Sequence, residues 1–514
     1  MKKNYLIFLI LSVLTIFIWN SVTYFNKKHF EKNKNNSSSV IKGESILLND
    51  YSNELNNTTK AKLITLTNDY YKITFTNKGA AILNCNVKEK NKTWIDLIPY
   101  SNKPILSTFS NVYYNIIPIS NKKIIFYHKN LKDGWIITKT YNLSNNHMHN
   151  VNVSIKKIVG KNVVLPKINF SWNINSKNDA NNNFNSSKLL VCEDSTANKI
   201  KKIKNDAEII ASLYKWIAID SKYFLIAFIP KEVIKFDKIF VSKITKNGPY
   251  SILLNPKQIN KNDTSLNYSI RFFIGPKKYD NLRNFNLGLE KTIDFGFFGF
   301  LGKLAFNVLK IIHNITNNYG WAIVLLTIIV QILLLPLTVT SFKSISTIRK
   351  LHPIIKNIQE KYKDDPKRLQ LEILNVYRLQ GVNPLGGCLP MLLQLPVFWA
   401  FFTMLRNIYE LRNENWIFWI KDLSSPDNLF NIGQFKFNLL PLIMGLSMFF
   451  QQKITNTVTT DANQKKMLYI IPIMFTFMFW TFPSGLVIYW TINNIVSIIE
   501  QSFILWRERD SNPR

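Results

Sequence analysis

A basic segment, residues 341–384, separates two apolar stretches of the chain. It contains nine lysine and arginine side chains but only four aspartates and glutamates. Because apolar stretches flank it on both sides, it is expected to connect two membrane helices, and short connections rich in Lys and Arg stay in the cytoplasm. The segment therefore predicts a multi-domain membrane protein and fixes the orientation of its helices.

The chain of 514 residues has two unlike parts. Residues 26–296 are polar and rich in Asn and Lys, whereas residues 319–506 are mostly apolar. The formal net charge of +33 would favour nucleic acid if it were concentrated in a patch. The lysines are instead scattered, and Lys, Asn, Ile, Phe and Tyr are over-used together, as AT-rich codons would produce. We expect no nucleic-acid partner.

The first apolar run follows Lys2 and Lys3 and extends to Phe25. It is long enough to span a bilayer and lacks a small-x-small cleavage site before the polar stretch. We therefore expect an uncleaved anchor over residues 4–25, with its N-terminus inside, and a polar tether over residues 26–60.

Residues 61–296 contain short alternating runs such as Tyr71–Thr76, Trp135–Tyr141 and Phe224–Ile229, broken by turn residues. Many short strands with no helical period between them predict an all-β, antiparallel sandwich. The orientation of the anchor places this domain on the external side. Cys85 and Cys192 lie in this region and could pair, but sequence cannot establish their proximity.

Residues 297–318 have an apolar face and a polar face at helical spacing. We expect an amphipathic helix in the membrane interface. The alternative is a helix packed on the β domain, which the same periodicity allows.

Further spans are expected at 319–339, 385–405, 438–451, 467–481 and 485–505, making six with the anchor. The connection 406–436 balances four basic against four acidic residues, so it is expected outside. The connection 451–467 has Lys453, Lys465 and Lys466 against Asp461, so it is expected inside. Both chain termini would then be cytoplasmic.

Polar side chains interrupt the expected spans. Thr327 and Gln331 are one turn apart on one face, and Gln394 lies between two prolines in the next span. The last span carries Thr491, Asn493, Asn494 and Ser497. They indicate either hydrogen bonds between helices or a polar cavity in the bundle, and periodicity alone favours the first.

The same pattern argues against several kinds of chemistry. No Asp, Lys or Arg lies at mid-depth in a span, which argues against an ion-coupled carrier. The chain has no GxxxxGK[ST] motif for nucleotide hydrolysis and no Cys/His pattern for a metal. We expect no cofactor.

Within the basic segment, apolar residues recur every three or four positions on both sides of Asp364-Asp365-Pro366. Pro366 suits the first turn of a helix, so we expect a helical hairpin with one apolar and one basic face. It is either a solvated connector near anionic lipid or a mobile cap that meets incoming chains or ribosomes. The basic residues of this cap are Lys343, Arg349, Lys350, Lys356, Lys361, Lys363, Lys367 and Arg368. Its expected hinge comprises Asn383, Pro384, Gly386 and Gly387.

Long motifs from residue 383 onward resemble the YidC/Oxa/Alb family of membrane insertases. They are Asn383–Pro390, Gln394–Phe398, Trp419–Ser424, Pro441–Phe450 and Phe482–Val487, and the match extends back over Tyr319–Trp321 and Pro336–Thr338. With the anchor and the large external domain, the chain is similar to the Gram-negative branch. The external domain is matched mainly by its position and by Trp216–Pro230.

The resemblance implies a membrane protein insertase and chaperone of the cell inner membrane rather than an enzyme. The spans would enclose a polar groove open to cytosol and lipid, and the periplasmic domain would be supersandwich-like. Implied partners are nascent membrane proteins, the Sec translocon and anionic lipids, while ribosome binding stays open. The resemblance assigns substrate contact to Thr327, Gln331, Gln394, Leu395, Phe398, Tyr489 and Trp490.

One residue departs from the family pattern. Relatives usually carry an arginine in the groove where this chain has Gln331, and a glutamine cannot attract an acidic tail by charge. The alternative function from another class is a solute transporter with a periplasmic domain. A third, a carbohydrate-active external domain, would need a carboxylate pair or a His/Glu site, and nothing in residues 61–290 singles one out.

Overall fold

The computed structural model describes residues 61–98, 104–158, 170–174, 188–193, 200–203, 207–210, 214–230, 236–243, 250–256, 264–381, 389–433, 435–455 and 462–510. The expected anchor (4–25), the tether (26–60) and the hinge residues Asn383, Pro384, Gly386 and Gly387 lie outside this range.

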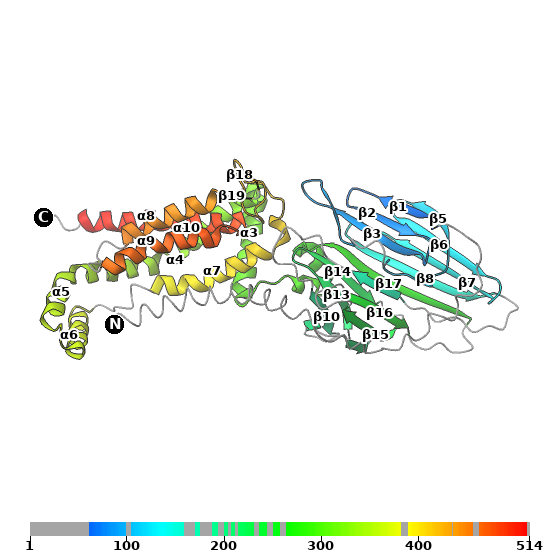
Figure 1. Cartoon of the computed structure of the whole chain (residues 1–514), viewed down its shortest axis with the longest axis horizontal. Coiled ribbons are helices and arrows are strands. Elements are labelled where there is room, and N and C mark those ends of the chain that lie inside the picture. The colour runs from blue at the N-terminus through cyan, green and yellow to red at the C-terminus, as the bar shows by residue number, and fades with distance from the viewer. Residues whose placement is uncertain are drawn as a thin grey trace. The chain divides into compact units, whose positions relative to one another are not determined.

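The first part of the described chain is β-rich, as its alternating pattern predicts, and its strand pairs are antiparallel (Figure 1). A nine-stranded sheet has the order β11-β10-β13-β14-β17-β8-β7-β6-β5. Its strands are β5 (Asn115–Ser120), β6 (Lys123–Asn130), β7 (Trp135–Asn142), β8 (Met148–Lys157), β10 (Lys188–Glu193), β11 (Ile200–Ile203), β13 (Tyr214–Asp220), β14 (Phe224–Pro230) and β17 (Ser265–Pro276).

Two four-stranded sheets accompany it. The first has the order β1-β2-β3-β4, with β1 (Leu63–Thr67), β2 (Tyr71–Thr76), β3 (Ala81–Lys88) and β4 (Trp94–Asp96). The second has the order β12-β15-β16-β9, with β9 (Phe170–Ile174), β12 (Ala207–Ile210), β15 (Phe236–Lys243) and β16 (Tyr250–Pro256).

The nine-stranded sheet buries apolar side chains on both faces. On β13, Ile217 and Ile219 belong to the core that includes Phe75, whereas Trp216 and Ala218 belong to a second core. Successive strand residues point to opposite faces, so one sheet serves both cores. The second core also contains residues of the helices that follow, which joins the β domain to the helical part.

Cys85 and Cys192 are both buried cysteines. Cys85 lies in the first core and Cys192 in the second. They do not form the disulfide that the sequence left open.

The rest of the described chain is helical apart from a short hairpin, β18 (Phe430–Ile432) with β19 (Phe435–Phe437). The helices after the β strands are α2 (Tyr279–Asn284), η2 (Leu289–Thr292), α3 (Gly299–Thr316), α4 (Tyr319–Lys350), α5 (His352–Lys361), α6 (Pro366–Leu379), α7 (Leu389–Asn407), η4 (Tyr409–Leu411), α8 (Leu440–Thr455), α9 (Ala462–Phe479) and α10 (Ser484–Asp510). Helix α10 packs against α7 and α8, α8 against α9, and α3 against α7.

Among the described helices, only Tyr319–Phe342 of α4 is by itself both long and apolar enough to cross a membrane. Ile470–Phe479 of α9 is a shorter apolar stretch. Helix α4 is longer than the expected span 319–339, because its helical backbone continues through Lys343, Arg349 and Lys350.

The helices nevertheless share one surface property. Exposed apolar side chains include Ile332 and Leu333 on α4, Leu446 on α8, Ile473 and Phe477 on α9, and Ile499 and Phe503 on α10. Exposed apolar area on this scale marks a surface that meets protein or lipid rather than water.

Helix α3 carries three stripes. Ala305, Phe306, Leu309 and Ile312 are buried in the second core. Phe300, Leu304, Ile311 and Ile315 form an exposed apolar stripe, and Lys303, Asn307, Lys310 and Asn314 lie beside it. The helix therefore packs on protein, and its outer face is amphipathic.

The described residues 343–381 belong to a separate compact unit, which contains α5 and α6. The two helices contact each other, and the Asp365 carboxylate caps α6 by accepting a hydrogen bond from the Arg368 backbone amide at 3.1 Å. The cap residues whose side chains are described are exposed, namely Lys350, Lys356, Lys361, Lys363, Lys367 and Arg368.

Candidate functional site

Three carboxamide side chains meet inside the helical bundle, one each from α4, α7 and α10. Gln331 Nε2 donates a hydrogen bond to Asn493 Oδ1, and Gln394 Nε2 donates to the same oxygen at 2.7 Å. We call Gln331, Gln394 and Asn493 the carboxamide cluster. Gln331 is 4% exposed, and the other two are partly exposed.

The depth of this cluster follows from helix geometry. Gln331 lies 12 residues after Tyr319, which corresponds to about 18 Å along α4 at 1.5 Å per residue. That position is near the middle of the apolar stretch Tyr319–Phe342. The three amides bond to one another through a single shared oxygen, so the cluster is polar but carries no net charge.

Several hydroxyls near the cluster are satisfied within their own helices. Thr327 is buried and donates to the Ile323 carbonyl at 2.7 Å, and Thr491 donates to the Val487 carbonyl at 2.8 Å. Asn494 instead faces α8, where its Nδ2 donates to Ser447 Oγ at 3.0 Å. These groups therefore already have hydrogen-bond partners in the bundle. The partly exposed amides of the cluster retain unused hydrogen-bonding capacity.

An aromatic group lies beside the cluster. The Trp490 ring contacts Phe398 edge-on at 4.7 Å between centroids, and Phe475 and Phe479 at 5.8 and 5.3 Å. Leu395, one residue after Gln394, is 40% exposed. Tyr489 is buried and stacks on Phe401 at 4.7 Å. Of the expected contact residues, the structure thus leaves Gln394, Leu395, Phe398 and Trp490 accessible.

The loop of residues 408–425, which we call the external loop because its charge balance predicts that side, closes one end of the bundle. The Asp422 carboxylate accepts hydrogen bonds from the backbone amides of Asn413 and Ser424, both at 2.9 Å. Ser484 Oγ, at the start of α10, donates to the Asp422 carbonyl at 2.8 Å, and the Gly485 amide donates to the Leu423 carbonyl. Trp416 packs on Gly320 at the start of α4. The loop therefore touches all three helices that carry the carboxamide cluster.

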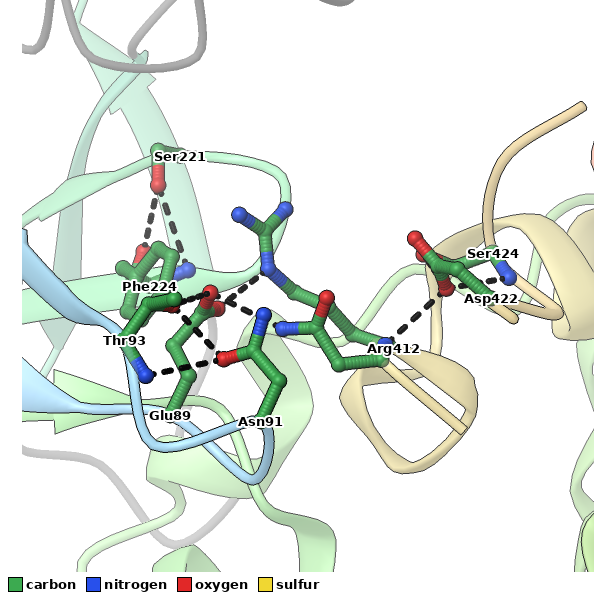
Figure 2. Close-up of polar contacts among 9 residues, drawn as sticks. Glu89, Asn91, Thr93, Ser221, Phe224, Arg412, Asp422 and Ser424 are labelled. Carbon is green, nitrogen blue, oxygen red and sulfur yellow. Dashed lines mark hydrogen bonds and ion pairs between the residues drawn. The ribbon is translucent and has the colours of Figure 1, made fainter. Parts of the chain in front are cut away.

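Two hairpins of the β domain meet the same loop (Figure 2). Glu89 follows β3 and pairs with Arg412 at 2.5 Å, and Asn413 Nδ2 donates to the other Glu89 oxygen at 2.9 Å. The Arg412 guanidinium also lies 4.9 Å from the Tyr223 ring and 5.4 Å from the Phe224 ring. Sequence reasoning missed these contacts, because Glu89 and Arg412 lie 323 residues apart.

Another acid of this contact region is partly buried. One oxygen of Glu410 accepts a hydrogen bond from the Tyr279 amide at 3.0 Å. Desolvation by burial raises the pKa of the Glu410 carboxyl, although this hydrogen bond acts in the opposite direction.

Asn493 is the main residue of the site that sequence reasoning did not single out. It was one of four polar residues in an apolar segment, with no sign of which of them faced α4 and α7. In the described residues no group of three or more potential metal ligands is present.

Two family models match the chain. The model described as 60Kd inner membrane protein matches residues 311–510, and the model described as YidC periplasmic domain matches residues 108–308. The two matches correspond to the helical part and to most of the β domain.

Relatives match over different lengths. A protein of Endomicrobium trichonymphae named membrane protein insertase YidC is 47% identical over 99% of both chains. One of Pelobacter propionicus with the same name is 40% identical, over 60% of this chain and 57% of its own length. Among solved structures, a YidC insertase crystal structure with its first transmembrane domain resolved covers 86% of this chain and 92% of its own, at 19% identity and a TM-score of 0.40.

Proposed function

The chain belongs to the YidC family of membrane protein insertases, and on that premise we propose that it inserts and folds integral proteins of the inner membrane. The observation that carries the proposal is the carboxamide cluster, in which α4, α7 and α10 each bring one uncharged amide to the middle of an otherwise apolar bundle. A structural packing role alone would not require two of these amides to be partly exposed.

The proposed mechanism lowers the barrier for a polar segment that must cross hydrocarbon. Burying an unpaired peptide amide costs about 2–7 kcal/mol, so even a short polar tail meets a high barrier in lipid. Amides at mid-depth offer replacement hydrogen bonds over part of this path. Meanwhile the apolar segment of the substrate would slide past Leu395, Phe398 and Trp490 into the lipid.

We propose six spans for this chain, with both termini in the cytoplasm and the β domain in the periplasm. The exposed apolar faces of α4, α8, α9 and α10 support this arrangement, because a water-soluble bundle would bury them. The outer stripe of α3 would lie at the external membrane surface.

The basic residues of the hairpin would act as a cytoplasmic cap, hinged at Asn383, Pro384, Gly386 and Gly387. Because the carboxamide cluster is uncharged, electrostatic recruitment of substrates and contact with anionic lipids would fall to this cap. Cooperation with the Sec translocon and contact with the ribosome are part of the proposal on family grounds.

Photo-cross-linking tests the proposal directly. We expect a cross-linker at Leu395 or Trp490 to capture a ribosome-bound nascent membrane protein. A cross-linker at Leu446, which is 58% exposed and lies on α8, a helix that contributes no residue to the cluster, serves as the control. Yield at Leu446 equal to that at Leu395 would contradict a defined substrate path.

The alternative, a solute transporter, finds no specific support in the structure. It predicts uptake of a solute by vesicles that contain the purified protein and no cross-links to nascent chains.

Gln331 leads to a prediction about substrate charge. We expect insertion of a single-span substrate to depend weakly on acidic residues in its tail, because a neutral amide cannot attract them. In Gln331→Arg, neutralising the tail should reduce insertion about tenfold, which corresponds to roughly 1.4 kcal/mol, close to the value of one hydrogen bond to a charged group. Insertion of the substrate with its acidic tail and with its neutralised tail should be measured in wild type, in Gln331→Arg and, as a second cation, in Gln331→Lys. Equal tail dependence in all three proteins would refute the idea.

A further inference from the structure

We propose that Glu89 and Lys90 of the β domain are positioning residues for the carboxamide cluster. They would hold the external loop, and through it the outer ends of α4, α7 and α10, in the register that brings Gln331, Gln394 and Asn493 together. This inference rests on the proposed function and adds a role for the β domain within it.

The first step of the argument is the hairpin that presents the two residues. The turn between β3 and β4 is closed by the Glu89 amide, which donates to the Thr93 carbonyl at 2.8 Å. Asn91 Oδ1 accepts hydrogen bonds from both the amide and the hydroxyl of Thr93, at 3.1 and 2.6 Å. A turn tied in this way holds its side chains in a fixed direction, so Glu89 and Lys90 reach the loop from a rigid base.

The second step is the contact itself. The Glu89 side chain is 4% exposed and that of Arg412 is 15% exposed, so their ion pair is largely desolvated. Lys90 pairs with Glu414, donates to the Glu410 carbonyl at 2.8 Å, and lies 5.3 Å from the ring of Tyr319, the first residue of α4. Breaking a buried pair by removing one partner leaves an uncompensated charge, so the contact tolerates little rearrangement.

Apolar packing reinforces the same contact. Tyr409, at the start of the loop, is buried in the core of the β domain and lies edge-on to Phe224 at 5.8 Å. Tyr223 Oη donates to the carbonyl of Arg406 near the end of α7 at 3.4 Å. The loop is therefore anchored in the β domain by both charge and burial.

The third step leads from the loop to the helices. Asn413 bonds Glu89 through its side chain and Asp422 through its backbone amide, and the Asp422 carbonyl accepts from Ser484 at the start of α10. Asn318 Nδ2 donates to the Asn415 carbonyl at 3.1 Å, while Asn318 Oδ1 caps α4 by accepting from the Gly320 amide at 2.8 Å. Helix α7 runs directly into the loop. A continuous set of contacts thus extends from Glu89 to each helix of the carboxamide cluster.

The test uses the full-length protein in vesicles that contain anionic phospholipid. Glu89→Ala removes the acceptor of both Arg412 and Asn413, Glu89→Gln keeps the shape without the charge, and Lys90→Ala breaks the pair with Glu414. Glu193→Ala is the control, because it breaks the more exposed Lys201–Glu193 pair on another β hairpin. Cross-linking from Leu395 to a nascent chain reports the substrate path, and amide hydrogen exchange reports residues 408–425 and the first turns of α4 and α10.

We expect Glu89→Ala to lower the cross-link yield roughly tenfold, as small misplacements of binding groups do, and to speed exchange in the loop and in both helix ends. The cross-link yield of Glu89→Gln should fall between those of Glu89→Ala and wild type. Lys90→Ala should give a yield similar to that of Glu89→Gln, and Glu193→Ala should match wild type. Near-UV circular dichroism verifies that the β domain of each variant is folded.

Two results would overturn the inference. One is unchanged yield and unchanged exchange in α4 and α10 while the loop itself exchanges faster. The other is an equal loss of yield in Glu193→Ala. If wild type itself gave no cross-links, the proposed function would fail instead, so the two failures are distinguishable.

Discussion

Gly320→Ala is expected to destabilise the protein by about 1–3 kcal/mol, the usual cost of overpacking a filled site. A methyl group at this position would lie 2.1 Å from Cδ1 and 2.7 Å from Cβ of Trp416. Contacts this short to Cβ cannot be relieved by rotating the end of a side chain, so the indole must leave its site. Since Trp416 belongs to the external loop, the start of α4 would lose its support there. Thermal unfolding of the purified protein in detergent measures the effect.

Gly299→Ala is the matched control. A methyl group there would meet only Phe295 Cβ, at 3.5 Å, which is an ordinary contact. Gly299 begins helix α3, where alanine is the better helix former, so we expect no loss of stability. A double-mutant cycle with Trp416→Ala adds a second criterion. If Gly320→Ala costs the same with and without the indole, the clash is not its cause.

Asp427→Ala should lower stability by about 3 kcal/mol, since it leaves several buried donors without an acceptor. Asp427 Oδ2 accepts from Trp419 Nε1 at 2.8 Å and from the backbone amides of Leu439 and Leu440 at 2.9 and 3.0 Å. The last two amides lie at the start of α8, so the carboxylate caps this helix from a distant point in the chain. Unfolding of the variant and wild type should be compared by the same thermal assay.

Two further substitutions calibrate this result. Asp427→Asn keeps one oxygen acceptor without the charge and should cost less than alanine. Asp365→Ala removes the exposed cap of α6 and should cost about 1 kcal/mol, as exposed caps do. If Asp427→Ala costs no more than Asp365→Ala, burial of the network does not amplify its contribution.

Patterns within short segments of the sequence predicted the helices and strands. Alternation along runs such as Trp135–Tyr141 predicted strands because the two faces of a strand meet different surroundings, and β7 covers that run. The apolar run from Tyr319 predicted a helix, although its true length was hidden because Lys and Arg are also good helix formers and carry α4 on to Lys350. Whether a segment forms a helix or a strand depends on residues that are close together in the chain, so the sequence can predict it.

The site could be predicted only in part. Gln331 and Gln394 stood out because carboxamides are costly in an apolar span, but the same argument applied equally to Thr327, Thr491 and Asn494. Only the packed helices separate them, since Thr327 and Thr491 bond within their own helices and Asn494 bonds to α8. Tyr489, expected at the substrate surface, instead stacks on Phe401.

The sequence by itself determined the β-rich part, the helical part and the uncharged character of the carboxamide cluster, because each depends on residue type and on spacing within one segment. The tertiary structure decided which amides converge and which end of the β domain touches the helices. Asn493 follows Gln331 by 162 residues, and Arg412 follows Glu89 by 323. Contacts between residues so far apart depend on how the whole chain packs. No pattern within one segment shows which distant segment it will meet.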